Sequence, residues 1–300
     1  MSSSDVSVVV CAFTVDRAQR LAEAVASLER QDPSPNEIIV VCDHAPALRA
    51  WAAAHLPDVV LLDNAHARGL SGARNTGLAA ARGSIVAFLD DDATAEPEWL
   101  ARLIGAYDDR RVVAAGGAVL PDWSGDRPRW LPEEFEWVVG CSYRGMPDTA
   151  TPVRNLIGAN MSFRRAALEG VEGFAENLGR VGSTPLGCEE TELCIRLQAA
   201  HPYGVILYDP RITVRHHVTP DRASLPYFLA RCRAEGISKA EVSRRAGRRD
   251  GLASERTYAT RTLPRGVITA LREGAYARAG AVVLGLAATT VGYATGTAGR

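Results

Sequence analysis

Three consecutive carboxylates, Asp90, Asp91 and Asp92, directly follow an apolar run at residues 85–89. Such a run is typical of a buried strand, and in open α/β sheets ligands bind beyond the carboxyl ends of the strands. Adjacent carboxylates repel one another unless a cation compensates their charge. The pattern predicts a Mg²⁺ or Mn²⁺ site shared with a diphosphate, because both ions prefer oxygen ligands. The alternative is a solvated acidic turn or helix cap, since Thr94 and Glu96 precede a predicted helix.

A second acidic group, Glu189, Glu190 and Glu192, opens a predicted helix at residues 189–200. A carboxylate can act as a general base near neutral pH. The same residues can also serve only as the acidic first turn that the helix dipole favours. Both interpretations stay open at this point.

A Gly- and Ala-rich segment, G-L-S-G-A-R-N-T-G at residues 69–77, begins the helix before the acidic strand. Small residues let a backbone approach a ligand closely, and Arg74 can meet a phosphate or a base. Close helix–sheet packing would favour the same residues. The first strand is followed by Cys11, Ala12 and Phe13 rather than G-x-G-x-x-G, and no P-loop occurs, which argues against NAD-type Rossmann enzymes and P-loop NTPases.

Alternating strands and helices must position these residues. Apolar runs and helical periodicity predict strands at 5–11, 38–42, 59–62, 85–89 and 112–120, with helices at 17–31, 47–55, 70–81 and 99–107. We expect residues 123–142 to form a loop region and residues 205–208 and 213–215 to form short closing strands. The order predicts an α/β fold with a mainly parallel sheet flanked by helices.

Composition supports a soluble globular protein. The 300 residues are 47% hydrophobic and 23% charged, with a formal net charge of -1. The charge is uneven, because residues 1–220 carry 20 basic and 29 acidic side chains whereas residues 221–278 carry 13 and 6. This argues against nucleic acid and favours an anionic membrane surface as partner of the C-terminal part. The 6 cysteines form no C-x-x-C, and no signal peptide is evident, so we expect a reduced, cytoplasmic chain.

Taken in order, these blocks resemble glycosyltransferase family 2. They are the Val-rich first strand, E-I-I-V-V-C-D (37–43), G-L-S-G-A-R-N-T-G, F-L-D-D-D, G-A-N-M-S-F-R-R (158–165) and C-E-E-T-E-L-C-I-R-L (188–197). The resemblance covers residues 5–217. It implies a GT-A fold, an inverting reaction, a nucleotide-sugar donor and a divalent metal, Mn²⁺ or Mg²⁺.

On the donor side, the resemblance places Asp90 and Asp92 on the family's D-x-D motif, with Asp92 binding the metal. Asp43 falls on the family's base-binding acidic pair, whose first member is replaced by Cys42. The expected contacts to the nucleotide sugar come from Ala12, Phe13, Asp43, Arg74, Asp90 and Asp91.

On the acceptor side, Glu190 falls on the family's catalytic Asp and is the expected general base. The longer Glu side chain leaves Glu189 or Glu192 as alternatives. Gly158, Asn160 and Glu189 are expected to face the acceptor. His216 or His217, at the end of a strand, is expected to be a further metal ligand, with a structural imidazole as the alternative. Trp123, Trp130 and Trp137 either stack on a sugar or form a hydrophobic cluster.

The C-terminal part differs in character. We expect residues 1–217 to form the catalytic domain, with a nucleotide-sugar half (about 1–120) and an acceptor half (121–217), and residues 218–300 to form a basic helical extension. Residues 279–296 carry no charge, which suits peripheral membrane attachment better than a packing helix or a membrane span. No Q-x-x-R-W block occurs, so the resemblance implies transfer of one sugar rather than a processive synthase.

The predicted function is therefore metal-dependent, inverting transfer of one sugar to a hydroxyl acceptor, either free or lipid-linked. We expect this reaction to serve glycolipid or cell-surface polysaccharide assembly at the cytoplasmic face of the membrane. Two alternatives remain. A nucleotidyltransferase would need a Gly-rich, basic loop after the first strand, which is absent. A catalytically inactive nucleotide-binding scaffold would explain the departures at Cys42 and Glu190.

Overall fold

The computed structural model describes residues 4–179, 187–246 and 253–298, and the chain divides into two compact units. Unit 1 comprises Met1–Leu120, Pro147–Thr184 and Glu189–His216, and unit 2 comprises Pro121–Met146, Pro185–Cys188 and His217–Arg300. The division after His216 lies next to the domain end expected at 217. Residues 121–146, expected in the acceptor half of the catalytic domain, instead belong to unit 2.

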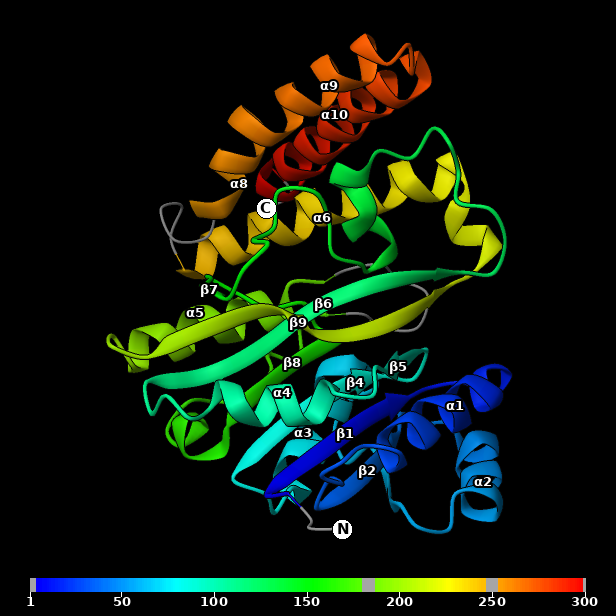
Figure 1. The fold of residues 1–300 in the computed structure, drawn as a ribbon, viewed down its shortest axis with the longest axis vertical. Helices are drawn as coiled ribbons and strands as arrows, with labels where there is room; N and C mark the ends of the chain where they lie inside the picture. The colour runs from blue at the N-terminus through cyan, green and yellow to red at the C-terminus, as the bar shows by residue number, and fades with distance from the viewer. Residues whose placement is uncertain (1–3, 180–186, 247–252, 299–300) are drawn as a thin grey trace. The chain divides into compact units, whose positions relative to one another are not determined.

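The first part of unit 1 alternates strands and helices (Figure 1). Its elements are β1 (Val6–Ala12), η1 (Val15–Arg17), α1 (Ala18–Glu29), β2 (Glu37–Cys42), α2 (Pro46–His55), β3 (Val60–Asp63), α3 (Leu70–Ala80) and β4 (Ile85–Asp90). Strand β1 pairs in parallel with β2 and β4, and β2 pairs in parallel with β3. The side chains of β1, β2 and β4 are almost all apolar and buried, as expected for parallel strands covered on both faces.

The remaining elements extend this sheet with antiparallel strands. They are β5 (Ala93–Ala95), α4 (Trp99–Ala106), β6 (Val112–Trp123), β7 (Thr151–Pro152), β8 (Asn160–Arg164), η3 (Arg165–Leu168), α5 (Glu189–Ala200) and β9 (Val205–Val218). In the described residues the sheet has nine strands in the order β3-β2-β1-β4-β8-β6-β9-β5, with β7 beside β9. Strand β8 lies antiparallel between β4 and β6. The sheet is thus parallel from β3 to β4, and β8, β6, β9, β5 and β7 extend it through antiparallel pairs.

Two details differ from the sequence expectations. Residues 160–164 form a sheet strand, and the two short closing strands are one continuous strand, β9. Strand β9 then brings His216 opposite Ala93 of β5, directly after the acidic triplet.

The register of the sheet gathers several strand ends at one edge. Cys11 of β1 lies opposite Asp90 of β4, and Ala12 lies opposite Cys42 of β2. Helix α3 lies unusually close to β1, because a Cβ atom on Gly77 would be 2.3 Å from Cγ1 of Val9. Side chains that follow β1, β2 and β4, or that project from the start of α3, therefore meet at this edge.

Unit 2 contains η2 (Glu133–Val139) and η4 (Pro220–Ala223) and a set of helices. The helices are α6 (Leu225–Ala246), α8 (Ala253–Thr257), the π-helical turn η5 (Tyr258–Thr262), α9 (Leu263–Arg272) and α10 (Tyr276–Ala298). Helices α6 and α10 pack side by side (Figure 1). A Cβ atom on Gly292 would be 2.0 Å from the carbonyl oxygen of Arg233, and one on Gly236 would be 2.1 Å from that of Thr289. These glycines allow the two helix backbones to touch.

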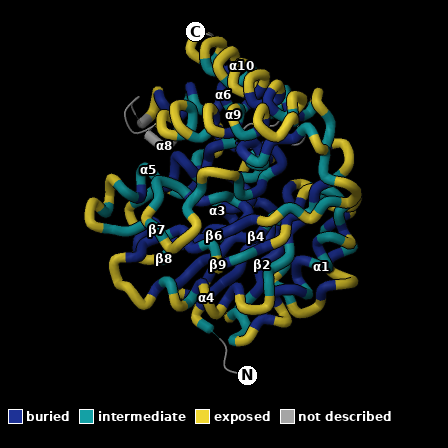
Figure 2. The backbone as a smooth tube through the Cα atoms, turned by 45° about the horizontal axis from the view of Figure 1, so that its top comes forward, coloured by how far each residue is buried: buried dark blue, intermediate teal, exposed yellow. Residues whose placement is uncertain are grey.

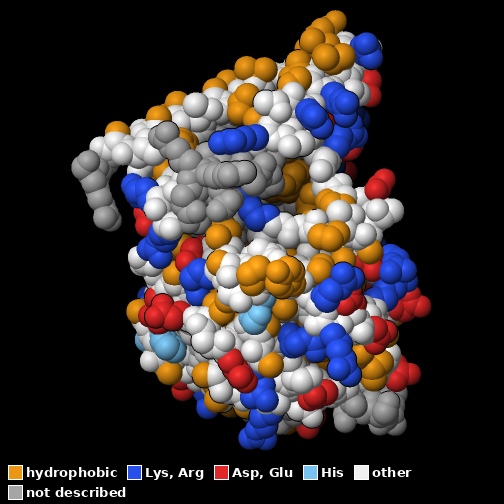
Figure 3. Space-filling model, turned by 90° about the vertical axis from the view of Figure 1, so that its left-hand side faces the viewer, with side chains coloured by type: hydrophobic (Ala, Val, Ile, Leu, Met, Phe, Trp, Pro, Cys, Tyr) orange, Lys and Arg blue, Asp and Glu red, His pale blue; other side chains and the backbone are white. Residues whose placement is uncertain are grey.

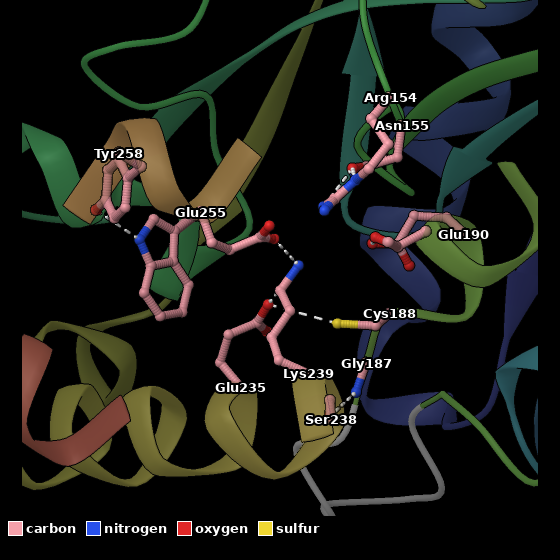
Figure 4. Close-up of polar contacts among 12 residues, drawn as sticks. Arg154, Asn155, Gly187, Cys188, Glu190, Glu235, Ser238, Lys239, Glu255 and Tyr258 are labelled. Atoms are coloured by element: carbon pink, nitrogen blue, oxygen red, sulfur yellow. Dashed lines mark hydrogen bonds and ion pairs between the residues drawn. The ribbon is translucent and has the colours of Figure 1, made fainter. Parts of the chain in front are cut away.

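An aromatic cluster forms the core of unit 2. Its buried members are Leu131, Phe135, Val138, Phe228, Cys232, Leu263 and Val282. Trp123, Trp130 and Trp137 pack against this cluster, and Trp137 Nε1 donates a hydrogen bond of 3.1 Å to Tyr258 Oη (Figure 4). The tryptophans therefore have the packing role that the sequence analysis weighed against sugar stacking. Figure 2 shows that α9 and α10 nevertheless keep long exposed stretches.

Candidate active site

The acidic triplet at the end of β4 meets a histidine from β9. One potential ligand atom from each of Asp90, Asp92 and His216 lies within 4.8 Å of the others. His216 Nε2 is 3.1 Å from Asp92 Oδ1, and both side chains are buried. Two carboxylates and an imidazole can hold a divalent cation, and the oxygen-rich set suits Mn²⁺ or Mg²⁺.

Arg17 is a partner of the triplet that the sequence analysis missed. Its Nη1 atom is 3.0 Å from Asp91 Oδ1 and 3.0 Å from Asp92 Oδ2, and its guanidinium group lies 5.2 Å from the ring centroid of Phe13. Burial, reinforced by repulsion from Asp92, raises the pKa of Asp91 to about 7, although Arg17 opposes this shift. The other Asp91 oxygen, Oδ2, is buried without a hydrogen-bond partner among the described residues. The triplet thus retains an excess of negative charge.

Arg74 links the triplet to the first turn of α5. Its Nη1 atom is 2.7 Å from Glu189 Oε1, and its Nη2 atom is 3.5 Å from Asp90 Oδ1. Nη2 also donates a 3.2 Å hydrogen bond to the carbonyl oxygen of Gly158, where an added Cβ would approach Nη2 to 2.9 Å. Burial opposes the Arg74 charge, but Glu189 and Asp90 outweigh this effect and raise the pKa of Arg74 above its usual value.

The three glutamates of α5 have different surroundings. Glu189 is buried against Arg74, and Glu192 forms a two-pronged ion pair with Arg196 at 2.8 and 2.7 Å. Each of these carboxylates is held in place by a neighbouring arginine. Glu190 is partly buried, and Thr191 Oγ1 lies 3.4 Å from its Oε1 atom.

Arg154 and Asn155 are further residues that no sequence pattern pointed to. Figure 4 shows their side chains beside the carboxylate of Glu190. Arg154 donates hydrogen bonds of 3.0 and 2.9 Å to Asn155 Oδ1. The guanidinium and amide groups therefore form a polar environment for Glu190 within unit 1.

The charges of this region do not balance. Five carboxylates, from Asp90, Asp91, Asp92, Glu189 and Glu190, are gathered with only three arginines, Arg17, Arg74 and Arg154. The carboxylates therefore outnumber the arginines, although Asp91, with its pKa raised to about 7, is partly protonated near neutral pH. The residues present thus fit a bound metal in their ligand chemistry, and a cation would offset negative charge in this region.

Asp43 has a supporting position at the end of β2. Its Oδ1 atom accepts a 2.7 Å hydrogen bond from Asn64 Nδ2, and its Oδ2 atom accepts one of 2.9 Å from the backbone N–H of Gly69. Its own N–H donates to the carbonyl oxygen of Ala12 at 2.8 Å. Asp43 therefore fixes the loop before α3, and through it the helix that carries Arg74.

Asn160 and His217 lie elsewhere than expected. Asn160 is fully buried: its Nδ2 atom donates to the carbonyl oxygens of Ala118 and Ile212, and its Oδ1 atom accepts from Trp99 Nε1. These three hydrogen bonds tie β8 to β6, β9 and α4. His217 points away from its neighbour, because side chains alternate along a strand, and its ring contacts Ser124 and Asp122 in unit 2.

The fold is that of GT-A glycosyltransferases. A mannosyltransferase from Pyrobaculum calidifontis, solved with GDP-Man and Mn²⁺, matches with a TM-score of 0.63 and 19% identity, covering 98% of this chain and 88% of that chain. A structure of GalNAc-T7 with UDP, GalNAc and Mn²⁺ matches with a TM-score of 0.51 and 16% identity, over 77% of this chain and 47% of that chain.

Sequence comparisons assign the family. Residues 7–171 match the family described as glycosyl transferase family 2, so the chain belongs to glycosyltransferase family 2. A glucosyl-dolichyl phosphate glucuronosyltransferase from Haloferax volcanii is 36% identical over 238 residues, covering 78% of this chain and 76% of that protein. The succinoglycan biosynthesis protein ExoM from Rhizobium meliloti is 28% identical over 232 residues, covering 74% of this chain and 70% of that protein. The expected family, fold and enzyme class are confirmed.

Proposed function

We propose that this glycosyltransferase catalyses inverting, metal-dependent transfer of one sugar from a nucleotide-diphosphate sugar to a hydroxyl group of a lipid-linked acceptor. The observation that carries the proposal is the meeting of Asp90, Asp92 and His216 at the strand edge where α/β enzymes bind their ligands. The relatives named for transfer to glucosyl-dolichyl phosphate and for succinoglycan biosynthesis support an acceptor in glycolipid or polysaccharide assembly.

Asp90, Asp92 and His216 would hold Mn²⁺ or Mg²⁺, which supplies the positive charge that stabilises a departing diphosphate. Arg17 orients Asp91 and Asp92, and Arg74 orients Asp90 and Glu189. Ala12, Phe13 and Asp43 lie at the ends of β1 and β2, on the side proposed for the nucleotide. His217 is left out of this ligand set because its ring contacts Ser124 and Asp122.

Glu190 is the proposed general base. The acceptor hydroxyl transfers its proton to the Glu190 carboxylate while its oxygen bonds to the anomeric carbon. The bond from that carbon to the diphosphate oxygen breaks on the opposite face, which inverts the configuration. Glu189 and Glu192 are buried, whereas Glu190 is half-buried and easier for a substrate to reach, which favours Glu190 over its two neighbours.

A lipid-linked acceptor places the reaction at a membrane surface, and we propose the cytoplasmic face because nucleotide sugars are the donors. Helix α10 is the one helix in the described residues that is long and apolar enough to cross a membrane, with a mean hydropathy of 1.3. The exposed apolar side chains of α10 and its packing on α6 support attachment along the membrane surface.

The proposal is tested with Glu190→Gln. We expect transfer to fall by roughly 10²–10⁴-fold, the usual contribution of a general base, while nucleotide affinity measured by calorimetry stays within about twofold. Glu190→Asp should retain part of the activity, and Glu192→Gln serves as the comparison variant. Full transfer by Glu190→Gln would refute the assignment. Donor binding without turnover by the unaltered chain would instead support an inactive scaffold.

A further inference from the structure

Exposed apolar side chains are concentrated on the last two helices of unit 2. Seven large hydrophobic residues between 268 and 291 are at least 39% exposed: Ile268, Leu271, Tyr276, Val283, Leu284, Leu286 and Val291. In Figure 3, where the C-terminal helices lie uppermost, hydrophobic side chains recur along the outer edge with basic side chains beside them. Such a concentration marks an interaction surface rather than ordinary surface scatter.

Helix α9 has the pattern of an interfacial helix. Its buried residues, Leu263, Gly266 and Ala270, recur every three or four positions, and Ile268 and Leu271 lie on the exposed side. Arg265 and Arg272 are exposed next to these two apolar residues. An exposed apolar strip bordered by arginines is typical of helices that lie in the headgroup region of a bilayer.

Helix α10 carries the apolar surface further. Its exposed side, including Val283, Leu284 and Val291, has no charged residue between 279 and 298. Its other side packs on α6, where Gly292 touches the backbone of Arg233. Helix α6 carries several charged side chains, so α10 cannot be surrounded by lipid on all sides while this packing holds. The geometry therefore favours α10 lying along a membrane rather than across it.

Charge identifies the partner. Residues 256–298 carry five arginines and a single acidic residue, Glu273, which pairs with Arg278. A second copy of this chain would bring the same positive charge, which repels, whereas an anionic leaflet attracts it. We propose that the exposed faces of α9 and α10 form a docking surface for anionic lipid, with Ile268, Leu271, Val283, Leu284 and Val291 immersed at the headgroup boundary. The inference rests on the proposed function only in that docking would give access to a lipid-linked acceptor.

The test is co-flotation of the full chain with phosphatidylcholine vesicles, with and without phosphatidylglycerol. We expect binding that is at least about tenfold stronger with phosphatidylglycerol and that weakens with salt. The double variant Ile268→Asp/Leu271→Asp should lose at least about tenfold of this binding, because each exposed apolar side chain becomes anionic. Tyr203→Asp, which alters a 92% exposed aromatic residue in unit 1, is the matched control and should bind as before.

Several results would overturn the inference. The first is equal flotation of the double variant and the unaltered chain, and the second is no flotation with phosphatidylglycerol. The third is retention of the chain on vesicles after an alkaline carbonate wash, which would indicate a membrane span. The fourth is a concentration-dependent dimer of the unaltered chain that does not form in the double variant. Hydrolysis of a soluble donor is measured on the same samples without vesicles. If hydrolysis persists while flotation fails, docking is refuted and the proposed function stands. If flotation succeeds while hydrolysis fails, docking stands and the proposed function is refuted.

Discussion

Removing the Arg17 guanidinium should destabilise the fold and at the same time strengthen metal binding. In Arg17→Ala, the buried carboxylates of Asp91 and Asp92 each lose an ion pair of 3.0 Å. Breaking a buried pair typically costs about 3–5 kcal/mol, but 26% of the Arg17 side chain is exposed, so solvent screening reduces the expected loss to roughly 2–3 kcal/mol. For a chain of this size this corresponds to a fall in Tm of about 3–5 °C.

Metal should reverse part of this loss, because the variant removes the positive charge that the buried carboxylates of Asp91 and Asp92 share. We expect its Mn²⁺ affinity, measured by calorimetry without nucleotide, to rise by about tenfold, or about 1.4 kcal/mol. The addition of Mn²⁺ should therefore raise the Tm of Arg17→Ala more than that of the unaltered chain. Arg20→Ala is the control, because Arg20 pairs with Glu23 on α1 and, among the described residues, has no ion pair with the acidic triplet. Weaker Mn²⁺ binding by Arg17→Ala, or an unchanged Tm, would refute the reasoning.

Three further predictions concern stability and thiol chemistry. Arg74→Met leaves Glu189 buried without its cation and should lower the free energy of unfolding in urea by about 3–5 kcal/mol; a loss below about 1 kcal/mol would contradict the ion-pair geometry. Gly292→Val must push α10 away from the Arg233 carbonyl and should therefore lower Tm. Gly280→Ala should leave Tm unchanged, because no atom lies within 4 Å of an added Cβ there. Equal melting temperatures of the two variants would argue against the α6–α10 contact. Burial raises the pKa of Cys194 and Cys232 to about 12 and that of Cys42 to about 11, so these three thiols should resist labelling at about pH 8 until the chain is denatured. Rapid labelling of the native chain at these thiols would show that their burial is wrong.

The parallel half of the sheet was predictable because its strands are continuous apolar runs that local rules detect. Strand β8 was not, since N-M-S-F-R is half polar and forms a strand only by insertion between β4 and β6. The buried amide of Asn160 donates hydrogen bonds to Ala118 and Ile212, which lie far from it along the sequence, so this support for β8 is not visible to local rules. Pro210 lies between the two short strands predicted at 205–208 and 213–215, which the structure joins into β9. Proline lacks the N–H that a strand interior uses, so local rules do not favour a strand that continues through it.

The residues of the candidate site were likewise predictable from the sequence only in part. Asp90 and Asp92 were found because they follow a strand directly. Arg17 was missed, because its contact with the triplet depends on the pairing of β1 with β4. The choice between His216 and His217 required the β5–β9 register, which sets His216 opposite Ala93 and turns the next side chain to the other face.

The most direct test of the account combines donor and metal in one panel. UDP-, GDP- and dTDP-sugars are crossed with Mn²⁺, Mg²⁺ and EDTA, and Tm and slow donor hydrolysis are measured for the unaltered chain and for Asp92→Asn. A donor at a hundredfold excess over its Kd stabilises the fold by about 2.7 kcal/mol. We predict that one donor raises Tm and is hydrolysed only with metal, and that Asp92→Asn loses both responses. A shift that persists in EDTA and in Asp92→Asn would contradict a metal-dependent donor site at the end of β4.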